Sequence, residues 1–176
     1  MKVYNSIISG CKIIEPEVHG DGRGFFIETF HHERYQKAAD INFNFVQDNH
    51  SRSSKNVLRG LHYQEKKPQG KLVRVVRGEV LDVAVDIRKD SKTYGKWDSV
   101  ILSDKNKKQF WIPPGLAHGF LVLSEFADFE YKCTDYYYPD YESCIVWNDP
   151  TLNIDWSINN PIVSDKDLKG KLFLDL

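Results

Sequence analysis

The sequence KLVRVVRGEVLDVAVDI spans residues 71–87 and contains two runs rich in valine and leucine. The pair Arg77-Gly78 separates the runs, so residues 71–76 and 79–87 are predicted to form a β-hairpin. Short runs of the same kind lie on both sides, at residues 25–30, 43–49, 57–64, 100–102, 109–112, 119–123, 130–137 and 144–147. Roughly ten short strands with turn signals between them indicate a mostly β, antiparallel sandwich or barrel.

Helices are expected only at the periphery. Residues 31–40 are the best helix candidate, and one helical turn is expected after Ser164 in an otherwise loop-like C-terminal region, residues 149–171. No repeat, low-complexity segment or linker interrupts the chain. Because 176 residues are enough to bury most of the unfolded surface, we expect residues 1–176 to form a single domain.

The composition argues against several classes of function. A net charge of −1 does not fit a polybasic nucleic-acid binder, and no stretch approaches the length of apolar sequence that spans a membrane. The three cysteines are odd in number and include no Cys-x-x-Cys spacing, so neither a disulfide framework nor a zinc ribbon is expected. Residues 1–10 lack the apolar run of a signal peptide. We therefore expect a cytoplasmic enzyme or binding domain.

The stretch LRGLHYQ, residues 58–64, places His62 in an apolar strand pattern between Arg59 and the later Lys71. A neutral imidazole can accept a proton, and a nearby cation can stabilise the charge that is left behind. This combination suits the removal of a proton next to a carbonyl. In a regular strand Gly60 and His62 share one face and Arg59 points to the other. Arg59 and His62 can serve one site only if the strand bulges or twists, which costs least at Gly60.

A second segment, PPGLAHGF at residues 113–120, delivers His118 through a Pro-Gly turn. Cupin barrels use such a turn for one metal ligand, and metal-binding cupins add a His-x-His pair and a later glutamate. Here those places hold His62, Gln64 and Lys71. An ammonium group repels a cation, and two histidines are too few for a tight zinc or iron site. We therefore expect no metal, with a structural His118 that donates to a backbone carbonyl as the alternative to a functional one.

Tyr131 and Tyr137 share one face of the strand predicted at residues 130–137, because they are six residues apart. The two rings can line one cavity at different depths, or they can be core and rim rings that hold the sheet. Asp82 and Asp86 interrupt an apolar strand, and we expect them to pair with arginines such as Arg74 or Arg88.

Several motifs, in order and at matching spacing, resemble the dTDP-4-dehydrorhamnose 3,5-epimerase family, a metal-free member of the cupin superfold. The matching motifs are DGRGFFIE at 21–28, QDN at 47–49, VLRGLHYQ at 57–64, QGKLV at 69–73, DVAVDIR at 82–88, PGLAHGF at 114–120, YKCT at 131–134 and SDKD at 164–167. The resemblance extends over about residues 14–166 and beyond. It implies an antiparallel jelly-roll (cupin-like) fold with short peripheral helices.

The resemblance also implies roles for individual residues. His62 is similar to the general base of the family, Asp167 to the carboxylate that orients it, and Tyr131 to the general acid on the opposite face. Lys71 resembles the residue that faces the 4-keto oxygen, and Tyr137 the ring that stacks on thymine. The substrate-binding positions of the family match Arg23, Phe26, Glu28, Gln47, Asp48, Asn49, Arg59, Lys71, His118, Tyr137, Glu142 and Lys166.

The implied reaction is epimerisation of dTDP-4-dehydro-6-deoxy-D-glucose at C3 and C5 to dTDP-4-dehydro-L-rhamnose. The 4-keto group acidifies the hydrogens at both carbons, so a base on one face of the ring and an acid on the other can invert each centre. No cofactor is implied, and the sequence has neither a Gly-x-Gly-x-x-Gly motif nor a P-loop. The implied partners are a dTDP-linked 4-keto-6-deoxy sugar and a second copy, because family members are usually homodimers whose N-terminal segments cross.

Two departures from the family pattern leave the exact sugar open. Asn56 occupies a position where glycine is common, and Ser157 follows Trp156 where proline is usual. An epimerase that inverts C3 alone is the main alternative, because the same acid and base can serve one centre. A metal-dependent cupin and a non-catalytic sugar-binding module are further alternatives.

Overall fold

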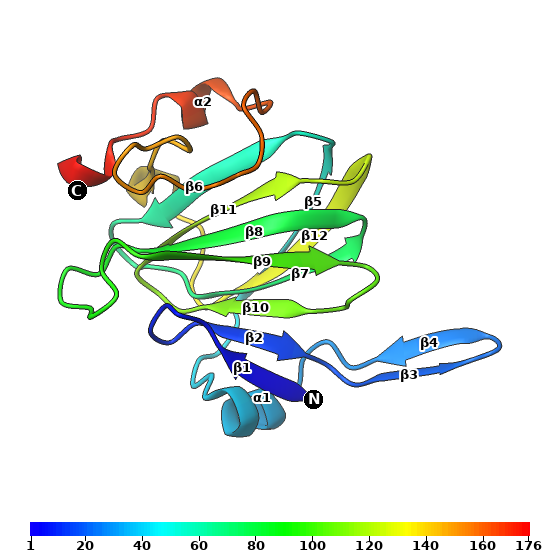
Figure 1. Ribbon diagram of the computed structural model, residues 1–176. Coiled ribbons are helices and arrows are strands. Elements are labelled where there is room, and N and C mark those ends of the chain that lie inside the picture. Colours follow the sequence, from blue (N-terminus) through cyan, green and yellow to red (C-terminus); the bar gives the residue numbers. More distant parts are fainter.

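The structure, a computed structural model that describes residues 1–176, is a sandwich of two antiparallel sheets (Figure 1). This arrangement confirms the predicted mostly β, antiparallel jelly-roll (cupin-like) class. In spatial order, the six-stranded sheet contains β1 (Lys2–Asn5), β2 (Lys12–Glu15), β10 (Gln109–Ile112), β7 (Lys71–Arg77), β12 (Phe126–Cys133) and β5 (Gln47–Ser54). The five-stranded sheet contains β13 (Glu142–Cys144), β6 (Leu58–Gln64), β11 (Leu116–Val122), β8 (Glu79–Asp86) and β9 (Trp97–Ser103).

The hairpin predicted around Arg77-Gly78 is wrong, because β7 and β8 belong to different sheets. Strand β7 pairs with β10 and β12, whereas β8 pairs with β9 and β11. Gly78 forms the corner between the sheets, with a φ of 85°. A Cβ atom there would lie 2.1 Å from the carbonyl oxygen of Phe126, so only glycine fits. The chain therefore passes from one wall of the sandwich to the other at this residue.

Side chains alternate between the two faces of the five-stranded sheet, and a separate apolar core lies on each face. On β8, Val80 and Ala84 pack between the sheets, while Val83 and Val85 belong to the cluster on the outer face. Both faces of β8 are thus buried, which explains its nearly continuous apolar sequence. Asp82 is on the inward face of the same strand and is fully buried. A buried carboxylate in such a position requires a partner, which the candidate site supplies.

Two short helices confirm the sequence predictions for residues 31–40 and for the turn after Ser164. Helix α1 (His32–Ala39) packs Tyr35 against the six-stranded sheet. Helix α2 (Asp165–Leu168) begins after Ser164, whose Oγ accepts a hydrogen bond from the Asp167 amide at 3.2 Å. None of the helices has the length and hydrophobicity that crossing a bilayer requires. Two 3₁₀ turns, η1 (Pro139–Tyr141) and η2 (Phe173–Asp175), are the other helical segments.

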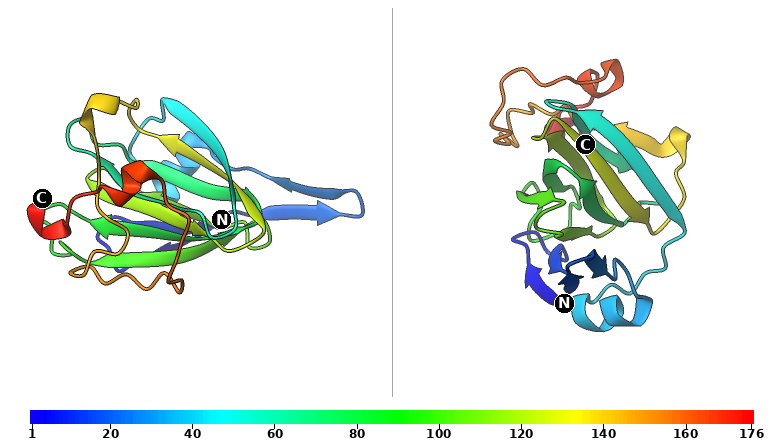
Figure 2. Two further views of the ribbon diagram at one scale, coloured as in Figure 1. Left: turned by 90° about the horizontal axis from the view of Figure 1, so that it is seen from above. Right: turned by 90° about the vertical axis from the view of Figure 1, so that its right-hand side faces the viewer.

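The C-terminal region lies over the outer face of the five-stranded sheet, beside β6 (Figures 1 and 2). Trp156 and Phe173 from this region are buried in the same apolar cluster as Leu61 of β6. Backbone bridges join Val57 to Ile162. This packing fixes the end of the chain, and with it α2, against the strand that carries His62.

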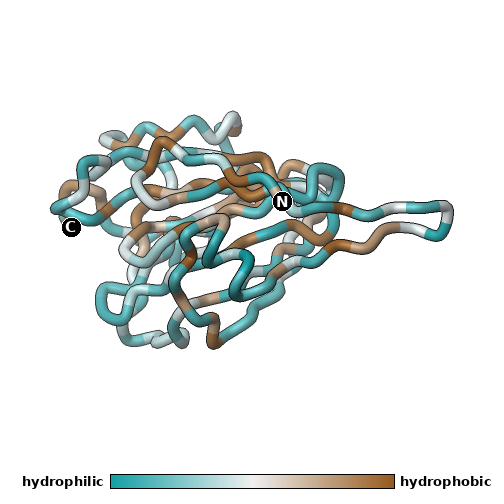
Figure 3. The backbone as a smooth tube through the Cα atoms, turned by 90° about the horizontal axis from the view of Figure 1, so that it is seen from below, coloured by the Kyte–Doolittle hydropathy of each residue, from teal (hydrophilic) through white to brown (hydrophobic).

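Strands β3 (Val18–Asp21) and β4 (Gly24–Ile27) form a hairpin, called the arm below, that projects from the sandwich (Figures 1 and 2). The arm pairs with neither large sheet. Its tip is hydrophilic, with hydrophobic positions along one strand (Figure 3). The side chains of Phe25 and Phe26 are largely exposed. The arm is therefore a poorly covered element, although the Lys107 ammonium group lies 4.0 Å from the centroid of the Phe25 ring.

Candidate active site

A pocket of about 340 Å³ lies between the two sheets and is lined by residues from both. Strand β6 contributes to one wall, and β7 and β12 contribute to the other. The predicted site residues that line it are Gln47, Asn49, Arg59, His62, Lys71, His118, Tyr131, Tyr137 and Glu142. Residues from distant parts of the sequence thus meet in one cavity, as the resemblance implied.

The predicted deformation of β6 at Gly60 is confirmed. In the pairing of β6 with β11, His62 lies opposite His118 but Arg59 lies opposite Phe120, so the register shifts across Gly60. Gly60 has a φ of 123°, and a Cβ atom there would lie 2.5 Å from the Cα of Gly119. The irregularity changes the simple alternation of the strand. Arg59 and His62 consequently both line the pocket.

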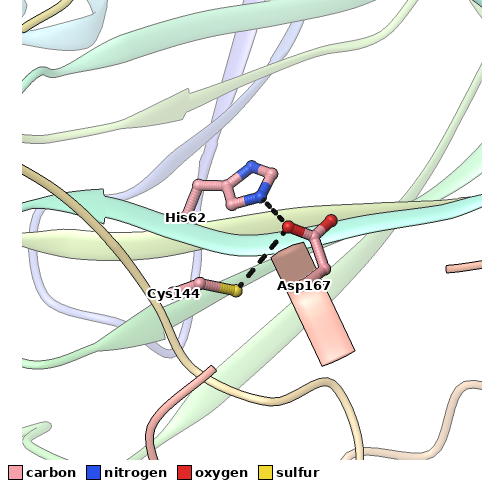
Figure 4. A group of neighbouring side chains, drawn as sticks. All are labelled: His62, Cys144 and Asp167. Atoms are coloured by element: carbon pink, nitrogen blue, oxygen red, sulfur yellow. Dashed lines mark hydrogen bonds and ion pairs between the residues drawn. The ribbon is translucent and has the colours of Figure 1, made fainter. Parts of the chain in front are cut away.

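His62 is held from behind by Asp167. The ring Nε2 lies 2.6 Å from Asp167 Oδ1, and the Gly60 amide donates to Oδ2 at 3.2 Å. Asp167 is 3% exposed, so burial alone would raise its pKa, but the hydrogen bond and the charge of His62 lower the pKa of Asp167 overall. With Nε2 committed to this carboxylate, Nδ1 lies on the other side of the ring (Figure 4). An oriented imidazole of this kind is suited to act as a base.

Tyr131 and Lys71 come from the opposite sheet. Burial raises the pKa of Tyr131 to about 12, so its hydroxyl keeps its proton at neutral pH. Burial lowers the pKa of Lys71, against weaker opposing effects of Cys133 and Asp82. No carboxylate lies within salt-bridge distance of the Lys71 ammonium group. The Tyr131 phenol and the unpaired Lys71 ammonium group therefore lie across the pocket from the His62 imidazole.

His118 forms a second buried pair at the pocket floor. Its Nε2 lies 2.9 Å from Asp82 Oδ2, so the expected bond to a backbone carbonyl and the expected arginine partner of Asp82 are both wrong. Burial lowers the pKa of His118, against the opposing effect of Asp82. The other strand aspartate, Asp86, does bind Arg88, at 2.7 Å. His62 and His118 thus each bind a different aspartate, and the pairing of His118 with Asp82 was not predicted from the sequence.

The mouth of the pocket holds a network of predicted substrate-binding residues. The Tyr137 hydroxyl donates to Glu142 Oε2 at 2.6 Å, and the Lys166 ammonium group binds the same oxygen. The Gln47 side chain accepts a hydrogen bond from the Tyr137 amide at 2.9 Å. Burial would raise the pKa of Glu142, but the bonds from Lys166 and Tyr137 lower it overall. Tyr131 and Tyr137 therefore do line one cavity, the inner ring half-buried and the outer one 45% exposed.

Five predicted substrate-binding residues do not line the pocket of this chain: Lys166, which binds Glu142 at its mouth, and four residues that lie farther away. Arg23 and Phe26 are on the arm, where the Arg23 side chain is 91% exposed and paired with its neighbour Asp21. Glu28 binds Arg34 at 2.9 Å beyond the base of the arm. Asp48 binds Lys132 at 3.0 Å. The family positions of these four residues are therefore not assembled with His62 within a single chain. The four residues are Arg23, Phe26, Glu28 and Asp48.

Sequence reasoning missed an apolar part of the wall. The rings of Phe120 and Phe129 stack with centroids 4.2 Å apart, and both line the pocket. Ser51 lies opposite Phe129 in the pairing of β5 with β12. The signal was present, because Phe129 is two residues from Tyr131 and Ser51 is two residues from Asn49. The remaining pocket residues outside the prediction are Gln69 and Gly119.

The geometry places this chain among acid–base isomerases built on a cupin-type sandwich. The sequence matches the family model described as dTDP-4-dehydrorhamnose 3,5-epimerase over residues 5–175. The chain belongs to this family.

Individual relatives agree over nearly the whole length. A dTDP-4-dehydrorhamnose 3,5-epimerase of Pseudomonas aeruginosa is 53% identical, over 99% of this chain and 97% of the relative. The crystal structure of the dTDP-6-deoxy-D-glucose-3,5-epimerase of Legionella pneumophila, in complex with dTDP-4-keto-L-rhamnose, is 56% identical, with a TM-score of 0.95 over 98% of this chain and 93% of that one. A 3′-monoepimerase of Streptomyces bikiniensis, in complex with dTDP-quinovose, is 33% identical, with a TM-score of 0.89 over 96% and 86%.

Proposed function

We propose that this chain converts dTDP-4-dehydro-6-deoxy-D-glucose to dTDP-4-dehydro-L-rhamnose by epimerisation at C3 and C5. One observation carries the proposal: a carboxylate-oriented histidine and a protonated tyrosine face one pocket from opposite sheets. Inversion of a carbon next to a ketone needs a base and an acid on opposite faces of a flat intermediate. The names of relatives more than 50% identical supply the substrate class.

In the proposed mechanism, His62 Nδ1 removes the proton from the carbon next to the 4-keto group. The electrons of the broken C–H bond move into an enolate whose oxygen faces the Lys71 ammonium group. The Tyr131 hydroxyl then gives its proton to the opposite face of the carbon, and exchange with water restores both groups. A positioned acid or base typically contributes about 10²–10⁴-fold each, and a donor at the oxyanion roughly 3–4 kcal/mol. The chain's own residues are sufficient for every step.

The remaining residues of the pocket are proposed to bind the nucleotide. Arg59 suits a pyrophosphate oxygen, because a guanidinium makes paired bonds to phosphate. Tyr137 at the mouth offers a largely exposed ring for the base. Glu142, Lys166, Gln47 and Asn49 surround it as polar contacts.

We further propose that the active form is a homodimer in which the arm of one chain reaches the pocket of its partner. Arg23 and Phe26 are family binding positions, yet they lie on the arm and do not line the pocket of their own chain. The arm projects from the sandwich (Figure 1). Exchange of arms would bring an arginine to the pyrophosphate and cover the exposed rings. Residues 1–176 are proposed to act as one catalytic domain, in the cytoplasm, where the three free cysteines stay reduced.

Incubation with the substrate in heavy water tests the reaction. NMR of the product is expected to show deuterium at both C3 and C5, because each inversion exchanges a carbon-bound proton with solvent. The similarity to a 3′-monoepimerase makes the pattern of labelling decisive. Deuterium at C3 alone would replace the proposal with a C3 epimerase. An unchanged sugar that still binds would indicate a non-catalytic binding module.

A further inference from the structure

A third potential metal ligand lies behind the His62–Asp167 pair. Cys144 is opposite His62 in the pairing of β13 with β6, and its thiol points toward Asp167 (Figure 4). Its Sγ lies 3.9 Å from Asp167 Oδ1, the oxygen that lies 2.6 Å from His62 Nε2. All three donor atoms lie within 4.8 Å of one another, and no other set of three or more His, Cys, Asp and Glu side chains in the chain has this spacing.

We propose that His62, Cys144 and Asp167 form a binding site for one soft divalent cation of the zinc and cadmium class, and that occupation of this site switches the enzyme off. The effect on activity rests on the proposed role of His62 as the base. The binding itself does not, because it depends only on the three side chains.

The donor set fits such a cation. Imidazole nitrogen, thiolate sulfur and carboxylate oxygen are the ligands that zinc uses, and thiolate favours soft cations over magnesium or calcium. Tetrahedral zinc with ordinary bond lengths places neighbouring donors about 3.4–3.6 Å apart. The distance from Asp167 Oδ1 to Nε2 is shorter than this and the distance to Sγ is longer. Modest side-chain rotations of opposite sense therefore bring both into range.

The charges also balance. Cys144 is a free cysteine whose thiol is buried beside Asp167. A bound dication displaces the thiol proton to solvent, and the thiolate and carboxylate together then neutralise its two charges. Cys144 is 7% exposed and Asp167 is 3% exposed, so a neutral assembly suits their surroundings.

Occupation would disable the base without blocking the pocket. In the cation-free state Nε2 lies toward Asp167 and Nδ1 lies away from it (Figure 4). Because an ionised carboxylate only accepts hydrogen bonds, the ring proton belongs on Nε2 and the lone pair on Nδ1. A cation on Nε2 moves that proton to Nδ1, so the ring has no lone pair left to accept a proton from the sugar. Neither Cys144 nor Asp167 lines the pocket. Inhibition should consequently lower kcat and leave KM largely unchanged.

Titration of the chelator-treated full-length protein with Cd²⁺ tests the site. We expect a thiolate-to-cadmium absorption band that saturates at one equivalent, release of one proton, and at least a tenfold loss of kcat that a chelator reverses. Cys144→Ser replaces the soft sulfur by oxygen at similar size. We expect this variant to lack the band and to need at least 30-fold more Cd²⁺ for the same fractional loss of its own metal-free rate.

Cys11→Ser is the matched control, because Cys11 is an equally buried free cysteine in the main core. It should keep both the band and the inhibition. A wild-type protein without the band, or a band that survives in Cys144→Ser, overturns the site. A saturated band with unchanged kcat overturns the switch. If the metal-free protein has no epimerase activity, the proposed function fails, while the absorption titration still decides whether the site exists.

Discussion

His62 and Arg23 are both expected to contact the same substrate, yet the structure holds them in opposite ways. The His62 side chain is 29% exposed and is fixed by a carboxylate that is 5% exposed. The Arg23 side chain is 91% exposed, and its one ion pair is to the neighbouring Asp21. Proton transfer needs geometry that is set before the substrate arrives, so its residues are built into the sandwich. Residues that recognise a flexible nucleotide can reach their binding positions later, when two chains assemble.

The largest difference between pocket and arm is expected for the base. His62→Ala should lower kcat by about 10³–10⁴-fold, because it removes the only positioned base, while binding of dTDP changes little. Steady-state kinetics and calorimetric titration with dTDP measure the two effects. The arm variant Phe26→Leu serves as the control and should keep kcat within a few-fold. Comparable losses of kcat in both variants would contradict the proposal that the pocket carries out proton transfer and the arm contributes only to binding.

A somewhat smaller effect is expected for the acid on the opposite wall. Tyr131→Phe removes the proton that is delivered to the enolate, and kcat should fall by about 10²–10³-fold. Exchange of the sugar C–H with heavy water should continue, because His62 can still remove and return a proton on its own face. NMR under these conditions separates exchange from inversion. Loss of exchange together with inversion would show that Tyr131 does more than donate the second proton.

The sequence predicted that the proposed base and acid share one pocket better than it predicted the architecture around them. The strand runs predicted a β sandwich, but the Arg77-Gly78 pair looked like a hairpin turn and is a corner between sheets. A local sequence pattern predicts that a segment forms a strand. Which sheet that strand joins depends on how both of its faces pack in the folded protein. Asp82 was assigned an arginine because its partner, His118, lies 36 residues away on another strand. The arm's separation from the pocket also depends on tertiary placement, which no local motif specifies.

The pH dependence of folding stability also distinguishes the pocket from the arm. The lowered pKa of Asp167 means that its ionised form stabilises the folded state above about pH 4, and that this contribution is lost as the pH falls through the folded-state pKa. Asp167→Asn should therefore lower the free energy of unfolding at pH 7 by about 1.5–3 kcal/mol, the size of a hydrogen bond to a charged group. The difference from wild type should shrink below pH 4. Urea unfolding across this range measures it.

Asp21→Asn on the arm is the matched control. The bond from Arg23 lowers the pKa of Asp21 as well, but the pair is exposed to solvent. Exposed pairs contribute little to stability, so this variant should unfold like wild type at every pH. Equal destabilisation by both substitutions would mean that the arm is packed as tightly as the pocket.

Mixing of two defective chains tests whether the arm serves its own pocket or the partner's. Arg23→Ala should raise KM about tenfold, because it removes a charged hydrogen bond to the pyrophosphate. A mixed dimer of His62→Ala and Arg23→Ala chains would contain one pocket with both residues native only if the arm crosses. The mixture should then show a lower KM than Arg23→Ala alone. An unchanged KM after verified subunit exchange would place the arm on its own pocket.

The smallest effect is expected when a single hydroxyl is removed at the mouth of the pocket, where the rigid and the exposed regions meet. Tyr137→Phe removes a hydroxyl that donates to Glu142, a carboxylate that Lys166 also binds. KM should rise less than threefold, because the ring is kept and the lost bond is partly exposed. Tyr137→Ala removes the ring, and KM should rise by roughly 5- to 100-fold, since stacking on a base contributes about 1–3 kcal/mol. If the Phe and Ala variants of Tyr137 instead raise KM equally, the hydrogen bond of the hydroxyl orders the mouth of the pocket. This part of the pocket would then resemble the rigid His62–Asp167 pair more than the arm.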